Sequence, residues 1–415
     1  MKKINLHKAA RATHQALRDM NELLVLNQVR ERQPISRIDI ADSTGLEGST
    51  VSKIVTRLLG NEFVYENGVG SASPQGGRKK RFLHLNPEKA YAIGVDLGPL
   101  HSTVALSDFS GRILRRATTM NYNDPQRSLE AVAKAIKKLL QTDLPPGFAR
   151  DRVAGIGVSL VGLVDTKEGR MLAADSLGWG DDVPVGSILR QALNLDLPLY
   201  FENGARLAAL AEIWFGRHLS PTARQPQDLV FLEISAGIGA GIVIQGQLFH
   251  GFLNGAGEFG HISLDPAGPA CKCGGHGCLE VYASEQATTE RYRALCRTEG
   301  IEVEAEVTIK NLLAHAAAGD PRAIESLRQT AGYLGRGLIP VIYSVNPEVI
   351  VLGGTITQAW DILYPEIRRV LAAQVARFFS SHVTITPSTL GEKPSLTGAI
   401  ALVLARAFAA PSLGW

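Results

Sequence analysis

The sequence predicts an α/β protein with a body of two lobes, preceded by a winged helix-turn-helix domain at the N-terminus. Two helical patterns separated by a glycine turn, followed by two short strand patterns, predict the N-terminal domain. From residue 91 onward, buried-strand patterns alternate with amphipathic helices, which predicts the α/β body. Because 415 residues exceed one ordinary compact domain, we expect two or three units.

The composition is that of a folded protein with a basic N-terminal segment. Hydrophobic residues make up 45% of the chain and charged residues 20%, which excludes a chain that is disordered, collagenous or coiled-coil throughout. Residues 1–85 hold 14 basic and 8 acidic residues, whereas the rest holds 29 and 32. A basic excess confined to one end favours a nucleic-acid-binding segment joined to a body with another function.

Neither a membrane span nor a signal peptide is expected. The longest charge-free apolar stretch, residues 234–249, has 16 residues, and a spanning helix needs about 18 or more. The basic N-terminus is followed by polar and charged residues where a signal peptide would be apolar. We therefore expect a cytoplasmic protein.

The N-terminal pattern predicts a helix-turn-helix. Residues 13–30 carry apolar side chains at steps of three and four, and Pro34 ends this helix. Ser36 is expected to cap a short helix that ends at Ser43, and Gly45 supplies the turn. A second helix is expected over residues 50–59, opened by Ser49; in this motif it lies in the major groove. Its exposed side chains, which suit phosphate and base contacts, are Ser49, Thr50, Ser52, Lys53, Thr56 and Arg57.

Two strand patterns after this helix predict a wing. Residues 62–66 and 81–85 flank a Gly/Ser/Pro-rich loop that contains Arg78 and Lys79. Such a tip can reach into a minor groove, whose negative potential attracts arginine. The alternative is a solvated hairpin without contact to DNA, and the helix-turn-helix beside it favours the wing. We expect residues 1–86 to form this domain, with a hinge at Asn86–Pro87.

The body pattern predicts two α/β lobes with a cleft between them. Strands are expected at residues 92–97, 103–108, 153–159, 229–234 and 348–352, and helices at residues 129–140, 205–215, 324–342 and 362–376. We expect the first lobe to span residues 87–200, completed by residues 391–415. The second lobe, residues 201–390, is expected to carry a metal site and the dimerisation surface.

The cysteine spacing predicts a metal site. His261, Cys271, Cys273 and Cys278 form a His-x9-Cys-x-Cys-x4-Cys pattern. One imidazole and three thiolates are a full tetrahedral ligand set for a structural zinc ion. His276 is an alternative ligand, but glycines on both sides of it predict an exposed loop. The remaining cysteine, Cys296, is expected in the core.

Four glycine-rich turns follow predicted strands, at residues 96–99, 235–241, 352–355 and 397–399. Each is ordinary turn chemistry by itself. Together with the cysteine segment they resemble the ROK family of repressors and sugar kinases, from residue 92 to the C-terminus. With the helix-turn-helix, the resemblance to the repressor branch extends over nearly the whole chain. It implies a two-lobed fold like that of actin and hexokinase.

The resemblance also implies a sugar pocket beside the zinc ion. The family's zinc ligands match His261 and the three clustered cysteines. Its sugar ligands match Asn203, Glu258, His261 and Glu280, so the zinc ion would shape one wall of the pocket. The alternative for these side chains is an ordinary surface or capping role.

The departures from the family separate its two branches. ROK kinases carry Glu-Asn-Asp-Ala, whose aspartate is the general base, but here Gly204 replaces it. The first phosphate loop has Pro99 after Gly98, which removes a backbone donor. The second begins Ser235-Ala236-Gly237 instead of Gly-Thr-Gly. We therefore assign no catalytic residue. Gly353 and Gly354 are retained where the resemblance places the adenosine of bound ATP.

These observations predict a sugar-responsive regulator of transcription, a repressor rather than an enzyme. Its expected partners are operator DNA, a sugar or sugar-phosphate effector and a second copy, as a homodimer or a dimer of dimers. One alternative is a sugar kinase with an appended DNA-binding domain. The other is a regulator controlled by a protein partner, such as a sugar-transport protein, with a vestigial pocket.

Overall fold

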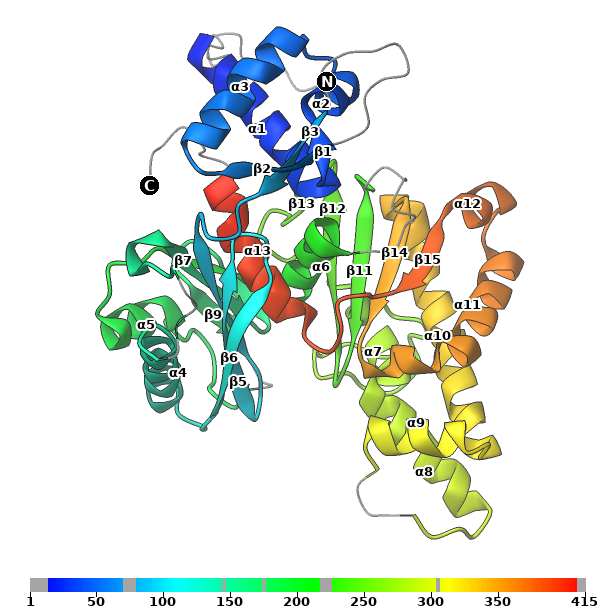
Figure 1. The fold of residues 1–415 in the computed structure, drawn as a ribbon. Coiled ribbons are helices and arrows are strands. Elements are labelled where there is room, and N and C mark those ends of the chain that lie inside the picture. Colours follow the sequence, from blue (N-terminus) through cyan, green and yellow to red (C-terminus); the bar gives the residue numbers. More distant parts are fainter. Residues whose placement is uncertain are drawn as a thin grey trace.

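The protein, described here from a computed structural model, has an N-terminal domain above two α/β lobes (Figure 1). The structure describes residues 14–69, 80–142, 144, 147–173, 177–216, 226–303 and 307–408. Helix α13 lies between the two lobes and its C-terminal end reaches the N-terminal domain. Among the described residues, no helix combines the length and apolar character that a membrane span requires.

The N-terminal domain is a winged helix-turn-helix, as predicted. Its elements are α1 (His14–Arg32), β1 (Ile35–Ser36), α2 (Arg37–Thr44), α3 (Gly48–Gly60), β2 (Val64–Val69) and β3 (Arg81–Leu85). Ser36 caps α2, because its Oγ accepts from the backbone N–H of Asp39 and the Asp39 carboxylate accepts from the backbone N–H of Ser36. Gly45 ends α2 with φ 70°, a left-handed conformation that glycine adopts without strain.

Two details of this domain differ from the sequence prediction. Helix α3 begins at Gly48, with Glu47 as the cap, so Ser49 lies inside the first turn. The expected hinge is held in place, since Phe109 N–H donates to Pro87 O and Asn86 N–H donates to Phe63 O. The wing tip, with Arg78 and Lys79, lies outside the described residues.

The first lobe is built on a five-stranded sheet with the order β10-β7-β4-β5-β6. Its elements are β4 (Tyr91–Leu97), β5 (His101–Asp108), β6 (Ile113–Met120), α4 (Pro125–Leu139), η1 (Arg150–Arg152), β7 (Val153–Leu160), β8 (Leu163–Asp165), β9 (Arg170–Ala173), α5 (Val185–Leu193) and β10 (Leu199–Asn203). Strands β4, β7 and β10 are parallel, and β5 and β6 join by antiparallel pairing. The expected lobe boundary at residue 200 falls inside β10, so the first sheet extends to Asn203.

The second lobe repeats this topology with the order β13-β12-β11-β14-β15. Its elements are α6 (Gly204–Phe215), β11 (Leu229–Ile234), β12 (Ile238–Ile244), β13 (Gln247–Leu248), η3 (Phe259–His261), α7 (Leu279–Ala283), α8 (Glu285–Thr298), α9 (Ile309–Ala317), α10 (Pro321–Val345), β14 (Val349–Gly353), η4 (Thr355–Ala359), α11 (Trp360–Gln374), α12 (Arg377–His382) and β15 (Thr384–Pro387). In each lobe an antiparallel three-strand meander is followed by two strands parallel to its first strand. The two lobes therefore share one architecture.

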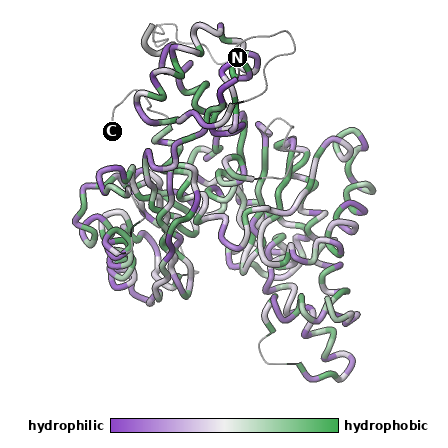
Figure 2. Tube along the Cα trace, viewed as in Figure 1, coloured by the Kyte–Doolittle hydropathy of each residue, from purple (hydrophilic) through white to green (hydrophobic). Residues whose placement is uncertain are grey.

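Helices α6 and α13 (Pro394–Phe408) pack against each other between the two sheets. Alternation along β11 explains the layering, because Val230, Leu232 and Ile234 belong to the core with α10 while Leu229 and Phe231 face α6. The strands of the second sheet are largely hydrophobic in Figure 2, whereas the outer helices alternate between the two colours. A further core joins α1 and α3 to α13, so the N-terminal domain packs directly on the body.

Candidate functional site

The predicted metal ligands come together in one cluster. The nearest ring nitrogen or sulfur atoms of the four residues all lie within 4.8 Å of one another; the residues are His261, Cys271, Cys273 and Cys278. Cys271 Sγ is 3.6 Å from His261 Nδ1, and Cys273 Sγ is 3.7 Å from Cys278 Sγ. A tetrahedral zinc ion, with bonds of about 2.3 Å to sulfur and 2.0–2.1 Å to nitrogen, requires edges of about 3.6 Å and 3.8 Å. The donor set fits such an ion.

The local backbone requires glycine at one of the positions between these ligands. A Cβ at Gly275 would lie 3.5 Å from Cys273 Sγ and 3.7 Å from Cys278 Sγ, which is ordinary van der Waals contact beside the cluster. Gly277 has φ 63°, and a Cβ there would collide with Asp265 O at 1.7 Å. The alternative ligand His276 is exposed and lies outside the cluster. The structure therefore favours His261 as the fourth ligand.

Two of the predicted sugar ligands adjoin the metal cluster. The ring of His261 turns Nδ1 toward Cys271 and places Nε2 3.9 Å from Glu258 Oε2. Glu280 follows the ligand Cys278 by two residues, in the first turn of α7. Its Oε2 accepts from the backbone N–H of Ile238 at 2.9 Å, and its Oε1 lies 3.2 Å from Lys272 Nζ. We call this group of ligands, with Glu258 and Glu280, the metal corner.

Asn203 is the N-cap of α6. Its Oδ1 accepts from the backbone N–H groups of Ala205 and Arg206, and its Nδ2 donates to Gly162 O at 2.9 Å. Among the described residues these bonds use one of the two amide hydrogens, so the capping role proposed as the alternative is present. A Cβ at Gly239 would lie 3.0 Å from Ala205 Cβ, and the adjacent Ile238 binds Glu280. The start of α6 thus reaches the metal corner through β12.

A buried ionic group beside Asn203 was missed by the sequence analysis. Glu202 is 3% exposed, and its two oxygens contact Arg206 Nε at 2.7 Å and His250 Nε2 at 2.6 Å. Burial opposes ionisation of Glu202, but His250 and Arg206 outweigh it and lower its pKa. Arg206 also donates to Asn254 O at 2.7 Å, so the group ties the loop before Glu258 to α6. Its members are separated in sequence, and only the i, i+4 spacing of Glu202 and Arg206 hinted at a pair.

The region of the expected phosphate loops is acidic, and one of its acids, Asp96, is paired. Asp96 accepts from Ser395 Oγ at 2.7 Å and lies 3.5 Å from Lys393 Nζ. Burial raises the pKa of Glu233 to about 8, with the carboxyl groups of Glu285 and Asp96 adding to the effect. A Cβ at Gly353 would lie 2.8 Å from Glu233 Oε2, which places this acid at the retained glycine turn. We call Asp96, Glu233 and Glu285 the acidic corner.

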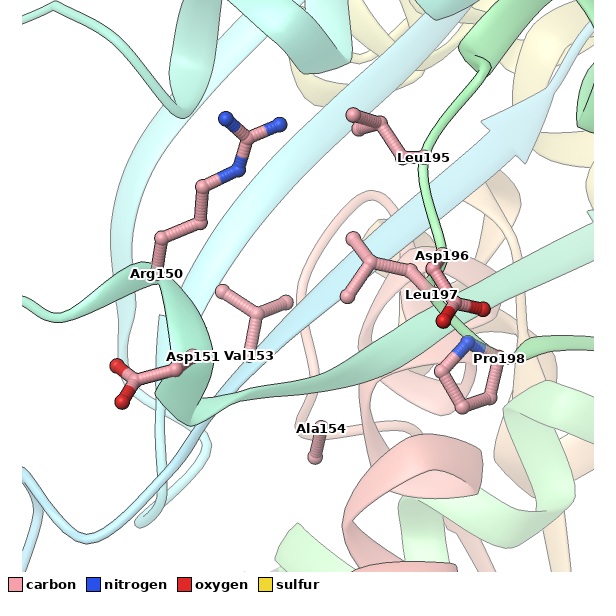
Figure 3. Close-up of a pocket in the computed structure, with 8 residues that line it drawn as sticks. All are labelled: Arg150, Asp151, Val153, Ala154, Leu195, Asp196, Leu197 and Pro198. Atoms are coloured by element: carbon pink, nitrogen blue, oxygen red, sulfur yellow. The ribbon is translucent and has the colours of Figure 1, made fainter.

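An open cavity of about 430 Å³ lies away from both corners (Figure 3). Its lining residues are Arg150, Asp151, Val153, Ala154, Leu195, Asp196, Leu197 and Pro198. These residues lie at the amino ends of β7 and β10, whereas Asn203 lies at the carboxyl end of β10. Ligands of open α/β sheets bind at the carboxyl ends, so this cavity is not the candidate sugar site.

The candidate DNA-binding face lies on α3. Four of the six side chains predicted to be exposed are exposed: Ser49, Lys53, Thr56 and Arg57. The prediction was wrong for Thr50 and Ser52, which are half-buried. Both of those side chains lie beside residues of the buried stripe, Val51, Ile54, Val55 and Leu58. Arg57 Nε lies 3.3 Å from Oε2 of Glu22, a fully buried residue of α1.

Comparison with known families covers both parts of the chain. A model of the ROK family matches residues 92–406, and a model of the MarR family matches residues 19–66. The chain is 30% identical to the xylose repressor of Caldicellulosiruptor bescii over 406 residues, which cover 94% of this chain and 97% of that relative.

Comparison of structures gives neighbours of two kinds. A ROK family transcriptional regulator, a homolog of the Escherichia coli MLC protein, has a TM-score of 0.74 at 29% identity, covering 95% of this chain and 98% of that one. A ROK family glucokinase from Streptomyces griseus, solved with glucose and AMPPNP, has a TM-score of 0.63 at 26% identity. That match covers 99% of the kinase but 75% of this chain.

Proposed function

The chain belongs to the ROK family, and from this membership we propose that it is a sugar-responsive, DNA-binding repressor of carbohydrate genes. The predicted fold, a winged helix-turn-helix followed by a two-lobed actin- and hexokinase-like body, is confirmed. One observation carries the proposal: a DNA-binding domain packs on a kinase-like body in which Gly204 stands where the kinases have their general base.

We propose that α3 binds the major groove of a near-palindromic operator. Lys53 and Arg57 on its exposed face suit base and phosphate contacts. The short hydroxyl side chains of the same helix would allow close approach to the DNA; they are Ser49, Thr50, Ser52 and Thr56. Arg78 and Lys79, outside the described residues, would enter the flanking minor groove. A homodimer formed through the second lobe would set two half-sites about one or two helical turns apart.

The effector in this proposal is a sugar or sugar phosphate bound beside a structural zinc ion. His261 and the three clustered cysteines would hold the zinc ion, which joins the loop after β13 to the start of α7. Glu258, His261, Glu280 and Asn203 would bind sugar hydroxyls. The burial of Glu280 and its bond to Ile238 N–H support this role, because they fix the carboxylate in one orientation.

We propose that the protein does not phosphorylate its sugar. Gly204 offers no group that could take a proton from a sugar hydroxyl, and a general base typically contributes about 10² to 10⁴-fold. Asp96 is already paired with Lys393 and Ser395.

Helix α6 offers a direct connection between the sugar site and the DNA-binding domain. Asn203 caps its first turn, and it ends at Trp214 and Phe215. There the Arg30 guanidinium of α1 lies 4.2 Å from the centre of the Trp214 ring and donates to Trp214 O. A movement of α6 on sugar binding would reach α1 through this contact. The sugar would then act through its different affinity for two domain arrangements.

Selection from random DNA, followed by sugar titration, tests the proposal. The full chain is expected to enrich a near-palindromic motif, and one sugar or sugar phosphate should lower its affinity for that motif. A pool without any enriched motif would overturn the repressor assignment. An enriched motif that no sugar affects would instead favour control by a protein partner, such as a sugar-transport protein, with a vestigial pocket.

A further inference from the structure

A carboxylate without a hydrogen bond is buried beneath the candidate recognition helix. Glu22 of α1 is fully buried, and among the described residues neither of its oxygens has a hydrogen-bond partner. Burial raises the pKa of Glu22, whereas the charge of Arg57 opposes that shift. A buried carboxylate is costly unless a counter-charge is close, and Arg57 Nε lies 3.3 Å from Glu22 Oε2.

Arg57 connects this buried charge to the DNA-binding face. Its side chain is 42% exposed, on the same face of α3 as Lys53 and Thr56. Nε is the guanidinium atom that faces Glu22 in this ion pair, so the four hydrogens on the two Nη atoms are available for DNA. The paired donors of a guanidinium match O6 and N7 of guanine in the major groove. A lysine could not make both contacts, because its ammonium is a point charge.

We propose that Glu22 is a positioning residue that holds Arg57 ready to read a guanine in the operator. The inference rests on the proposed function, since it names one base contact of the same DNA-binding face. A long side chain whose guanidinium is already held by an ion pair loses less rotamer freedom on binding, so the bidentate contact forms in one geometry. Glu22 therefore contributes to base discrimination, although it cannot itself reach DNA from the core.

This role differs from that of an ordinary buried ion pair. A purely structural pair affects the stability of the domain, and its loss would weaken binding to every DNA sequence equally. A positioning residue affects the preference at one base pair of each half-site. Loss of the negative charge of Glu22 should leave binding to unrelated DNA unchanged or slightly stronger, because phosphate binding depends on net positive charge.

Three variants of the full-length chain separate these roles on the selected operator. Glu22→Gln keeps the shape of the side chain and removes its charge, and Arg57→Lys keeps the charge and removes the paired donors. The matched control is Asp42→Asn, which removes an exposed acidic charge from α2 of the same domain. Binding is measured on the operator, on operators with each base pair replaced, and on unrelated DNA; thermal unfolding reports folding.

Glu22→Gln and Arg57→Lys are expected to lose roughly ten-fold discrimination at the same single G·C pair of each half-site. Affinity for unrelated DNA should stay within about two-fold, and Asp42→Asn should keep the full preference. The double variant should lose no more than either single variant, because both remove one contact.

Three outcomes would overturn the inference: an unchanged base preference in folded Glu22→Gln, an equal loss at all positions, or losses at different base pairs in the two variants. If Glu22→Gln does not fold, the test rests on Arg57→Lys. An unchanged preference for the G·C pair in that variant would contradict the guanine contact. Failure of the wild-type chain to select any motif would instead refute the proposed function.

Discussion

The metal corner and the acidic corner lie in the same two-lobed body, but their polar groups are arranged differently. In the metal corner, four possible ligand atoms lie within 4.8 Å of one another, and Glu280 is fixed beside them. In the acidic corner, Asp96 is paired with Lys393, while burial raises the pKa of Glu233 to about 8. The metal corner groups four possible ligand atoms, whereas in the acidic corner one oxygen each of Glu233 and Glu285 is buried without a hydrogen-bond partner among the described residues.

This contrast teaches that the residues of two corners can differ in their arrangement while the duplicated fold around them stays the same. The duplicated sheets and the helix pair α6 and α13 depend on buried apolar residues, and the half-buried Gly204 is not one of them. Substitutions such as glycine at position 204 therefore leave the fold intact. Four expected outcomes test how far the two corners are independent.

The largest effect is expected from loss of a metal ligand. Cys273→Ser should reduce bound zinc from about one equivalent to less than a tenth and weaken sugar binding by at least about 100-fold, because the loops carrying Glu258 and Glu280 lose their shared anchor. Elemental analysis and sugar titration measure this. Cys296→Ser, a buried cysteine outside the cluster, should keep the metal. Full sugar affinity in metal-free protein would show that the metal corner does not need an ion.

The next effect concerns catalysis at position 204. The wild-type chain should show no turnover near the roughly 1 to 100 s⁻¹ of active kinases in a coupled ATP assay with hexoses and pentoses. Gly204→Asp should remain far below this range, even though a general base supplies about 10² to 10⁴-fold, because Asp96 stays paired with Lys393. Gly204→Ala is the matched control without a carboxyl group. Kinase-like turnover in either the wild type or Gly204→Asp would contradict the absence of a working phosphate site.

The acidic corner should make stability depend on pH. Glu233 has a folded-state pKa of about 8, above the ordinary value of 4.5, so the native state binds the proton more tightly. The free energy of unfolding should therefore fall as pH rises from about 4.5 to 8. Glu233→Gln should remove this loss and be more stable than wild type by about 3 to 5 kcal/mol at pH 9, but by little at pH 4.

Denaturant unfolding at a series of pH values checks this prediction. Glu302→Gln, which changes an exposed carboxyl group of the same lobe, should show the pH dependence of the wild type. A constant difference between Glu233→Gln and wild type across the pH range would mean that the pKa of Glu233 is the same in the folded and unfolded states, which contradicts the prediction.

The smallest effect is expected from a substitution at the C-terminal end of α6, where this helix contacts α1. Trp214→Ala removes the ring beneath Arg30 and should reduce the effect of the sugar on operator affinity to less than about two-fold, from a typical coupling of 5- to 150-fold. Sugar and operator affinities measured separately should change little, and Trp214→Phe should preserve most of the coupling. Unaltered coupling in Trp214→Ala would show that the signal takes another route.

Local patterns in the sequence determined much of this protein. The helix-turn-helix followed from apolar spacing, the Ser36 cap and the Gly45 turn, which involve neighbouring residues only. The four candidate metal ligands lie within eighteen residues, from His261 to Cys278, so their spacing and residue types were sufficient to predict that they form one cluster. The apolar periods of the body likewise predicted its main strands and helices, because burial on one face imposes a regular spacing.

Tertiary structure alone decided which side chains are already engaged. The Glu202 contacts with Arg206 and His250, the Asp96 contacts with Lys393 and Ser395, and the Glu22 contact with Arg57 join positions on different elements. Most of these partners are separated by tens to hundreds of residues, and no periodic pattern links them. Folding brings them together through the packing of whole helices and sheets. Whether a polar group is free to bind a ligand depends on that packing, whereas its residue type depends on the sequence.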